Sequence, residues 1–371
     1  MKIVHLLLGK ANPERSNGVN RSVDGLARAQ RRAGAEVEVW GITPTPQAPT
    51  SARGYPLRLF GPGSNRLRLS GELRDALAAL AHDDVVHFHG GYHPEFQAAA
   101  RILARGGRSW VVTPHGAFRR AVVRAAWIKK RTWLALFQRH LLERARAVQV
   151  FSQREADELR RYAPRARIVV LPNGIEAGAP REPAAHEQRL VFGFLGRLEQ
   201  HTKGLDLLID GFARYREAGG TGELVLVGAG PDESALRERA REAGCSAQIR
   251  FAGECFGDEK RAELDRFDVF LHPSRHEGMP MAVLEAAGSG LPCLLSRETN
   301  LAEAFERRAA GLVLEPNDAA TLARALLSCE ELARDGRLER MARAARELMR
   351  EEFEPGTLAA RSLAELYVSA A

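Results

Sequence analysis

The chain lacks the features that mark several large classes of protein. Its 371 residues include four cysteines that form no C-x-x-C pair: Cys245, Cys255, Cys293 and Cys329. This scatter argues against a structural zinc site and a disulfide scaffold, so we expect buried or unreactive thiols. No apolar run approaches the roughly 18 residues that a membrane-spanning helix requires. Residues 3–8 are too short for a signal-peptide core and fit a buried strand, so we expect a cytoplasmic protein.

Charged residues of both signs are plentiful, with an excess of positive charge. The chain has 54 Lys and Arg against 47 Asp and Glu, a net charge of +7. Such a balance is compatible with nucleic acid, an anionic membrane surface or a phosphorylated substrate. The sequence contains no recognisable DNA- or RNA-reading motif, which leaves the last two classes.

Short β-branched runs alternate with helical patterns, which is typical of parallel sheets with crossover helices. In the first half we expect strands at 2–8, 36–41, 84–89, 109–113, 147–151 and 167–171, with helices at 19–33 and 70–80. In the second half we expect strands at 190–195, 223–227, 248–252, 267–271, 292–295 and 311–314, with helices at 204–217, 232–243 and 280–289. The length and pattern predict an α/β protein of two Rossmann-like, doubly wound domains; where two such domains face each other, the ligand would lie in the central cleft between them. The domains are 1–175 and 189–354, joined by a linker at 176–188.

The most informative stretch is residues 274–292. Glu277 lies in a Gly/Pro loop, and Glu285 lies eight residues later in a helix that Pro280 suits as a first-turn residue. The amides of Gly278 and Met279 would point, with the helix dipole, at a ligand in front of them. Two acids and free amides can grip a polyhydroxyl, phosphorylated ligand. Taken alone, the segment is better explained as a surface helix with two solvated glutamates.

Other expected strand ends in the second half also carry polar or flexible residues. Arg197 follows one strand, and Lys203 opens the next expected helix, so together they could clamp a diphosphate. Gly228 and Gly230 end another strand, where the backbone can approach a ligand closely, and Phe251 lies at the end of the next.

The first half contributes three histidines and a glycine. Gly18 precedes a helix that we expect to begin near Asn20, and its amide could reach a phosphate, although a plain loop glycine is a serious alternative. His115 follows a strand in Pro-His-Gly, and His87 and His89 end another strand. A lone histidine is more often structural than functional, and we give His87 and His89 lower weight than His115.

The Glu277-x7-Glu285 spacing, with Pro273-Ser274, Gly278, Pro280 and Ala286 around it, resembles the signature of retaining glycosyltransferases of the GT-B fold, family 4. The resemblance implies that Arg197 and Lys203 hold the leaving diphosphate and that Glu285 holds the ribose. It implies that Glu277 and the Gly278 and Met279 amides orient the donor sugar, and that Gly228, Gly230 and Phe251 border the nucleotide pocket.

The same resemblance extends to the first domain and the C-terminus. The Pro-His-Gly segment is similar to that of transferases that build bacterial surface polysaccharides, which implies that His115 hydrogen-bonds the transferred sugar. His87 and His89 would lie on the acceptor side, and Gly18 near a phosphate. Residues 355–371 would form a helix that crosses back onto the first domain.

The sequence offers no Asp-x-Asp pair at an expected strand end to signal a metal-bound diphosphate. We therefore expect cations and helix dipoles to replace the metal, with a nucleoside-diphosphate sugar as donor and no cofactor. The acceptor would be a saccharide or a lipid-linked saccharide. Residues 119–146 have nine Lys/Arg, one acid and two tryptophans, so they could touch an anionic membrane surface while their apolar face packs on the first domain.

Two alternatives remain open on the sequence. One keeps the fold but changes the reaction, to a nucleotide-sugar epimerase or hydrolase; the E-x7-E segment with its cations speaks against it. The other is a basic nucleic-acid-binding protein, suggested by the charge alone and disfavoured by the regular βα order. The donor base, sugar, acceptor, linkage and oligomeric state are not encoded in a readable motif.

Overall fold

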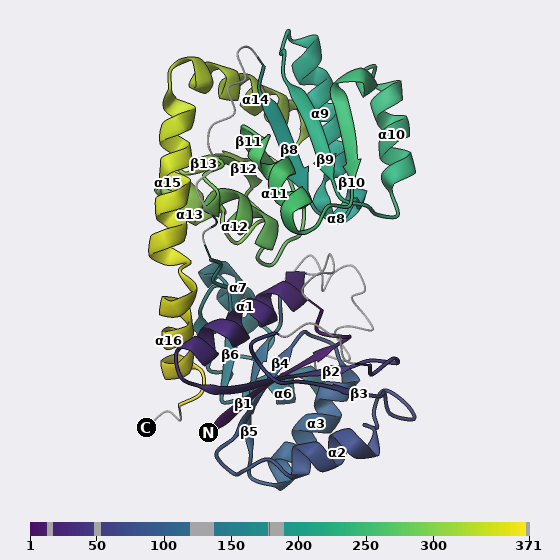
Figure 1. Cartoon of the computed structure of the whole chain (residues 1–371), viewed down its shortest axis with the longest axis vertical. Coiled ribbons are helices and arrows are strands. Elements are labelled where there is room, and N and C mark those ends of the chain that lie inside the picture. The colour runs from purple at the N-terminus through teal and green to yellow at the C-terminus, as the bar shows by residue number, and fades with distance from the viewer. Residues whose placement is uncertain (13–17, 48–52, 119–136, 177, 179–188, 369–371) are drawn as a thin grey trace. The chain divides into compact units, whose positions relative to one another are not determined.

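The computed structural model describes residues 1–12, 18–47, 53–118, 137–176, 178 and 189–368. These residues form two compact units, each with its own parallel sheet (Figure 1). Unit 1 contains Met1–Gly174 and Pro355–Ala371, and unit 2 contains Ile175–Glu354. The expected linker, 176–188, lies outside the described residues except for 176 and 178.

Unit 1 contains a seven-stranded sheet in the order β3-β2-β1-β4-β5-β6-β7, with every pairing parallel. Its strands are β1 (Lys2–Leu8), β2 (Glu36–Ile42), β3 (Leu57–Phe60), β4 (Val85–His89), β5 (Ser109–Thr113), β6 (Ala147–Val150) and β7 (Ile168–Val170). Its described helices are α1 (Gly18–Arg32), α2 (Gly71–Ala78), α3 (Pro94–Arg105), α6 (Arg139–Glu143), α7 (Gln153–Arg160) and α16 (Pro355–Glu365). The edge strand β3 was not predicted, because four residues are too few to show a period.

The alternation of side chains along β1 explains why both faces of this sheet are covered. Val4 and Leu6 point to one face and pack with α2 and α3, whereas Ile3 and Leu7 point to the other and pack with α1 and α16. His5 shares the second face and is fully buried there. A buried polar side chain needs hydrogen-bond partners, and Gln30 of α1 and His89 of β4 provide them.

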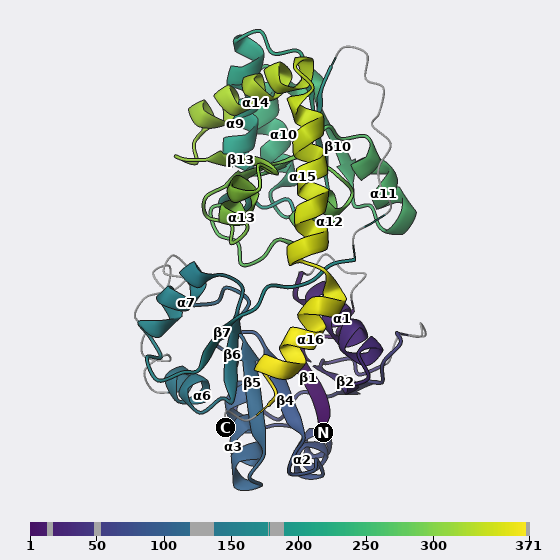
Figure 2. The same ribbon diagram turned by 90° about the vertical axis from the view of Figure 1, so that its left-hand side faces the viewer.

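The C-terminal helix belongs to unit 1, as predicted. Helix α16 lies beside α1 in both views (Figure 1 and Figure 2). Ser362 and Tyr367 are buried and accept hydrogen bonds from Gln30 of α1. Helix α16 and the residues that follow it, up to Tyr367, therefore form part of the core of unit 1.

Unit 2 contains a six-stranded parallel sheet in the order β10-β9-β8-β11-β12-β13. Its strands are β8 (Val191–Leu195), β9 (Glu223–Val227), β10 (Ile249–Gly253), β11 (Val269–His272), β12 (Cys293–Ser296) and β13 (Gly311–Leu314). The described helices are α8 (Gln200–Lys203), α9 (Leu205–Glu217), α10 (Glu233–Glu242), the 3-10 turn η2 (Ser246–Gln248), α11 (Gly257–Asp265), α12 (Met281–Gly288), α13 (Ala302–Arg307), α14 (Ala319–Arg334) and α15 (Arg337–Glu352). The prediction of two Rossmann-like α/β domains is confirmed.

Three expected helix starts need correction. Helix α1 begins at Gly18 rather than near Asn20, and α12 begins at Met281, with Pro280 extended in front of it. Lys203 does not open a helix but ends the short α8, because Gly204 adopts a left-handed conformation (φ 66°) before α9 begins. A Cβ at Gly204 would collide with the carbonyl oxygen of Pro273, so glycine is required where the two loops meet.

Within the described ranges, no helix is both long enough and apolar enough to cross a bilayer.

Candidate active site

Both sheets have a switch point where the strand order reverses, between β1 and β4 in unit 1 and between β8 and β11 in unit 2. In doubly wound sheets, ligands bind beyond the carboxyl ends of the strands at such a point. Arg197 and Lys203 follow β8, and Glu277 follows β11. The strand order thus brings together residues that lie 74 positions apart, as Lys203 and Glu277 do.

The ammonium group of Lys203 forms an ion pair with a carboxylate oxygen of Glu277. Both side chains are about one-fifth exposed, so the pair is shielded but within reach of solvent. His272, at the end of β11, places its Nε2 3.4 Å from the same oxygen and 3.0 Å from Ser274 Oγ. The sequence suggested a separate role for each charge, but the structure joins Lys203 and Glu277 directly.

The surroundings of Glu277 keep it ionised. Burial by itself would raise the pKa of Glu277, but the positive charge of Lys203 and the hydrogen bond from His272 lower it to about 2. Burial is also the main reason why the pKa of His272 lies below its usual value. At neutral pH Glu277 is therefore a carboxylate and His272 a neutral imidazole.

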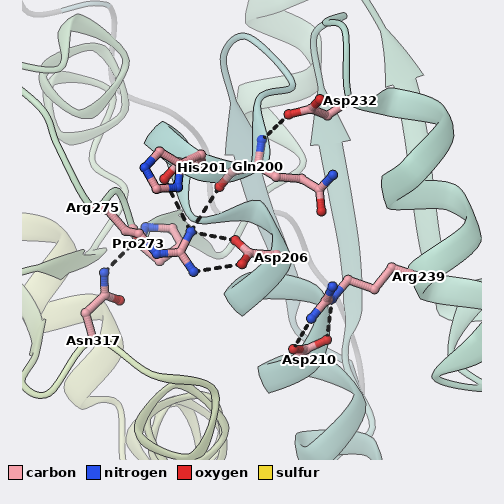
Figure 3. A network of polar contacts seen from close by, with 9 residues as sticks. All are labelled: Gln200, His201, Asp206, Asp210, Asp232, Arg239, Pro273, Arg275 and Asn317. Atoms are coloured by element: carbon pink, nitrogen blue, oxygen red, sulfur yellow. Dashed lines mark hydrogen bonds and ion pairs between the residues drawn. The ribbon is translucent and has the colours of Figure 1, made fainter. Parts of the chain in front are cut away.

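Arg275 fastens together the two loops that carry this pair, as Figure 3 shows. Its guanidinium forms a forked pair with Asp206 of α9, with both N–O distances at 2.7 Å. It also donates to the carbonyl oxygens of Gln200 (3.1 Å) and His201 (3.3 Å) at the start of α8. Sequence reasoning missed Arg275 because nothing in the sequence indicates that it contacts residues 200–206.

Two further hydrogen bonds support the same loop. The amide of Arg275 donates to the Thr202 carbonyl at 2.9 Å, and Asn317 Nδ2 donates to the Pro273 carbonyl at 3.0 Å (Figure 3). Because the backbone of the loop is held from both sides, the Lys203–Glu277 pair is preorganised.

Arg197 is exposed two residues after β8, beside the turn that contains Gly228 and Gly230. A Cβ at Gly228 would collide with the Gly196 carbonyl, and one at Gly230 with the Leu198 carbonyl. The Leu198 amide donates to the Ala229 carbonyl at 3.0 Å. Glycine is thus required at both positions because this turn packs closely against the loop that carries Arg197.

Glu285 lies on α12 and forms an ion pair with Lys260 of α11, with an N–O distance of 2.9 Å. Sequence reasoning missed Lys260, because no short-range pattern links it to Glu285. Phe251 is half-buried beneath the guanidinium of Arg237, whose carbon lies 4.2 Å from the ring centroid. Gly278 and Met279 lie in the turn that leads to Pro280 and α12, with the Met279 side chain buried.

In unit 1, His115 stands in a tight turn after β5. Both His115 and Gly116 have left-handed backbones, with φ of 52° and 77°. This conformation is strained for histidine and is typical of functional sites. The buried carboxylate of Glu155 accepts hydrogen bonds from the amides of Gly116 (3.1 Å) and Phe151 (2.9 Å), which holds the turn in place. Sequence reasoning missed Glu155, although it is the acid of a Ser152-x-x-Glu155 helix-start pattern in which Ser152 caps α7.

His87 and His89, expected on the acceptor side, are 0% and 3% exposed. His89 Nδ1 lies 3.1 Å from Nε2 of His115, which is half-buried. The buried His89 is thus hydrogen-bonded to a histidine that reaches the surface. Gly18 is exposed at the first residue of α1, and residues 119–136 of the expected basic segment lie outside the described part of the chain.

Three buried histidines, His5, His87 and His89, have ring nitrogens close enough to one another to hold a metal ion. However, all six of these nitrogens already share hydrogen bonds of 2.6–3.1 Å with other side chains. The donor set is thus satisfied without an ion, and we do not assign a metal site to it.

Comparisons with known proteins agree along the chain. The family description "Glycosyl transferases group 1" matches residues 189–331, and "Glycosyltransferase Family 4" matches residues 16–178. The glycogen synthase of Mycobacterium tuberculosis is 32% identical over 209 residues, 55% of this chain and 49% of that protein. The GDP-mannose:cellobiosyl-diphosphopolyprenol alpha-mannosyltransferase of Komagataeibacter xylinus is 26% identical over 319 residues, 83% of this chain and 79% of that protein.

The chain spans between 49% and 62% of the length of the curated relatives that it matches at 32% identity. Among solved structures, Alr3699/HepE of Anabaena in complex with UDP has a TM-score of 0.78 at 19% identity, covering 99% of this chain and all of that one. The likeness to this solved structure concerns the fold. The two family matches together cover more than half of the sequence. The chain therefore belongs to the family 4, or group 1, glycosyltransferases, and it has their GT-B fold.

Proposed function

We propose that this chain is a retaining glycosyltransferase that moves a hexose-type sugar from a UDP- or GDP-sugar to an acceptor hydroxyl. The observation that carries the proposal is the half-buried Lys203–Glu277 pair at the switch point of unit 2. It offers a cation for a leaving diphosphate and a carboxylate for sugar hydroxyls. Glu285 would hold the ribose hydroxyls in the same unit.

In this reaction the bond between the anomeric carbon and the diphosphate oxygen breaks as the acceptor oxygen bonds to the same face of that carbon. The acceptor proton passes to the leaving phosphate, and the transition state has oxocarbenium character, by analogy with other glycosyl transfer. Lys203 and Arg197 would stabilise the negative charge that grows on the diphosphate. This scheme requires no metal, and His115 would hydrogen-bond the transferred sugar.

The names of similar proteins support the substrate class. One relative uses GDP-mannose and a diphosphopolyprenol-linked acceptor, and solved structures of Alr3699/HepE contain UDP, UDP with glucose, or UDP-glucose. We therefore propose a role in surface-polysaccharide or lipid-linked oligosaccharide synthesis, in the cytoplasm or at the inner face of the membrane.

The donor site is tested by thermal shift with UDP and GDP, without added metal. We expect one nucleotide to raise the melting temperature of the wild type and to lose that effect in Glu285→Gln. Glu263→Gln is a matched control, because Glu263 is a similarly shielded, ion-paired glutamate of the same unit. A shift that survives in Glu285→Gln, or no shift with either nucleotide, contradicts the assignment.

The reaction type is tested by ¹H NMR of the product anomer. Retention of the donor configuration in an acceptor-linked product is the expected result. Release of free sugar with no acceptor product would favour a hydrolase instead.

Membrane contact through residues 119–146 is tested by vesicle sedimentation. We expect salt-sensitive binding to anionic vesicles, because the segment carries an excess of positive charge. Absence of binding at low salt would remove the membrane from the proposal.

A further inference from the structure

A continuous chain of hydrogen bonds runs through the core of unit 1, from the Leu171 carbonyl to His115. It passes through buried side chains of β6, β5, β4, the C-terminal segment, α1 and β1: Gln149, Thr113, His87, Tyr367, Gln30, His5 and His89. Each link is between 2.6 and 3.1 Å long. Because each neutral imidazole has one N–H, fixing the direction of one link fixes all that follow.

The first anchor is a backbone carbonyl, which can only accept. Gln149 Nε2 donates to the Leu171 oxygen at 2.9 Å, so Gln149 Oε1 faces Thr113 and accepts its hydroxyl proton at 2.8 Å. The Thr113 oxygen must then accept from His87 Nε2 at 2.6 Å. His87 therefore carries its proton on Nε2.

The unprotonated Nδ1 of His87 accepts from the Tyr367 hydroxyl at 2.7 Å. Having given its proton to His87, the Tyr367 oxygen accepts from Gln30 Nε2 at 3.1 Å. The amide of Gln30 is thereby oriented with Oε1 towards His5.

A second anchor gives the same orientation independently. The Ser362 hydroxyl donates to the Ala359 carbonyl at 2.7 Å, so its oxygen is left to accept from Gln30 Nε2 at 2.9 Å. Two carbonyls on different segments thus agree on which end of the Gln30 amide faces His5.

From Gln30 the direction passes through three histidines. His5 Nε2 donates to Gln30 Oε1 at 2.8 Å, so His5 Nδ1 accepts from His89 Nε2 at 2.9 Å. His89 Nδ1 then accepts from His115 Nε2 at 3.1 Å. His115 is therefore protonated on Nε2, and among the residues that the structure describes no donor is hydrogen-bonded to its Nδ1.

The direction of these hydrogen bonds is fixed only while the imidazole rings are neutral, and their surroundings favour the neutral form. Burial lowers the pKa of His5 to about 4 and that of His115 to about 3, and it also lowers the pKa values of His87 and His89. All four rings are thus uncharged at neutral pH.

We propose that Gln30 and Tyr367 are positioning residues that hold His115 as the Nε2–H tautomer, so that its Nδ1 accepts a hydrogen bond from a saccharide hydroxyl. The saccharide part of this statement rests on the proposed function, whereas the tautomer does not. A nitrogen that can only accept selects a hydroxyl and rejects a phosphate or carboxylate oxygen. The C-terminal segment of the chain would thus influence which ligand group His115 can bind.

The tautomer is measured directly by ¹⁵N NMR of the full-length protein labelled at histidine, with His115 assigned by its loss in His115→Asn. We expect proton-coupled Nε2 and an unprotonated Nδ1 for His115 in the wild type. Protonation at Nδ1 would overturn the proposal, without any variant having to fold.

The role of Gln30 is tested by Gln30→Met, which removes the acceptor for His5. We expect His115 in this variant to populate the Nδ1-protonated form, because the direction of the chain is no longer fixed. Gln97→Met is the matched control, since Gln97 is a buried glutamine of unit 1 that stands outside the chain of hydrogen bonds. An unchanged tautomer in Gln30→Met, or the same change in Gln97→Met, would contradict the assignment.

Kinetics give a second measurement. We expect Gln30→Met to lower kcat/KM roughly two- to tenfold, which corresponds to the free energy of one hydrogen bond. The affinity for the free nucleotide should be unchanged. A loss of nucleotide affinity would point to general damage and count against a positioning role. If nucleotides do not bind even the wild type, the proposed function fails, but the NMR result on the tautomer still stands.

Discussion

The polar side chains near the two switch points differ in charge and in exposure. In unit 2 the polar side chains are charged and partly exposed, as with Lys203, Glu277, Lys260 and Glu285. In unit 1 the side chains of His5, His87 and His89 are neutral, buried and joined by short hydrogen bonds. Fixed charges can stabilise an opposite charge that appears during a reaction, whereas the buried neutral imidazoles of unit 1 act through directed hydrogen bonds.

The site of unit 2 depends on ion pairs, whereas the site of unit 1 depends on the tautomers of its histidines. A partly exposed ion pair can exchange one partner for a ligand of the same charge, so Lys203 can turn from Glu277 towards a phosphate. The buried chain in unit 1 cannot accept a charge without a large desolvation cost. We therefore expect substitutions in unit 2 to affect turnover most strongly.

The largest expected effect follows removal of a cation of unit 2. Lys203→Ala and Arg197→Ala should each lower kcat by about 10²–10³-fold, as the loss of an oxyanion donor does. Steady-state kinetics with the identified donor provide the measurement, and Arg214→Ala, an exposed arginine of α9, is the control. Near-normal turnover in Arg197→Ala would contradict its role in the diphosphate clamp.

The second prediction separates positioning from simple ion pairing. Arg275→Lys cannot keep the fork to Asp206 together with the carbonyl contacts to Gln200 and His201, so we expect about a tenfold loss of kcat. Arg239→Lys is the matched control, because Arg239 forms an equivalent fork with Asp210, with both distances at 2.6 Å (Figure 3). Equal losses of kcat in the two variants would show that Arg275 does not position the site.

The third prediction concerns pH. The folded-state pKa of Glu277, about 2, lies below its usual 4.5, so this group adds stability above pH 4.5 that disappears as the pH falls towards 2. In Lys203→Met, burial without the compensating charge should raise the folded-state pKa of Glu277, so the stability that the wild type loses between pH 4.5 and 2 should shrink and the melting temperature should fall less on acidification. Melting temperatures between pH 3 and 7 measure the effect, and superimposable profiles for the two proteins would refute it.

The smallest expected effect on turnover is in unit 1. His115→Ala removes a neutral hydrogen bond, so we expect kcat/KM to fall roughly two- to tenfold, far less than in Lys203→Ala. Parallel assays under the same conditions make the comparison. A loss in His115→Ala as large as in Lys203→Ala would mean that the division between charged and neutral sites is wrong.

Much of the fold could be predicted from local patterns. Strands β8 (Val191–Leu195) and β11 (Val269–His272) are short apolar runs flanked by polar loops, and such runs predict buried parallel strands. The edge strand β3 and the left-handed Gly204 could not be predicted, because both depend on what packs against them.

Candidate residues of unit 2 were predictable from their spacing, but their partners were not. The Glu277-x7-Glu285 pattern lies within one loop and helix, and Arg275 lies in the same loop, whereas Lys203, Asp206 and Lys260 meet these residues only through folding. In unit 1 the sequence indicated His115, His87 and His89 but not His5, because a histidine inside a first strand has no distinguishing context.

The sequence by itself determined two α/β domains, a polar loop after one strand of each, and the acids and cations available for chemistry. Local periodicity and composition suffice for this because strands and helices are decided over a few residues. Tertiary structure decided which charges meet and which histidine nitrogen carries a proton. These depend on contacts between distant residues, such as Gln30 with Tyr367, that only the packed core brings within hydrogen-bond distance.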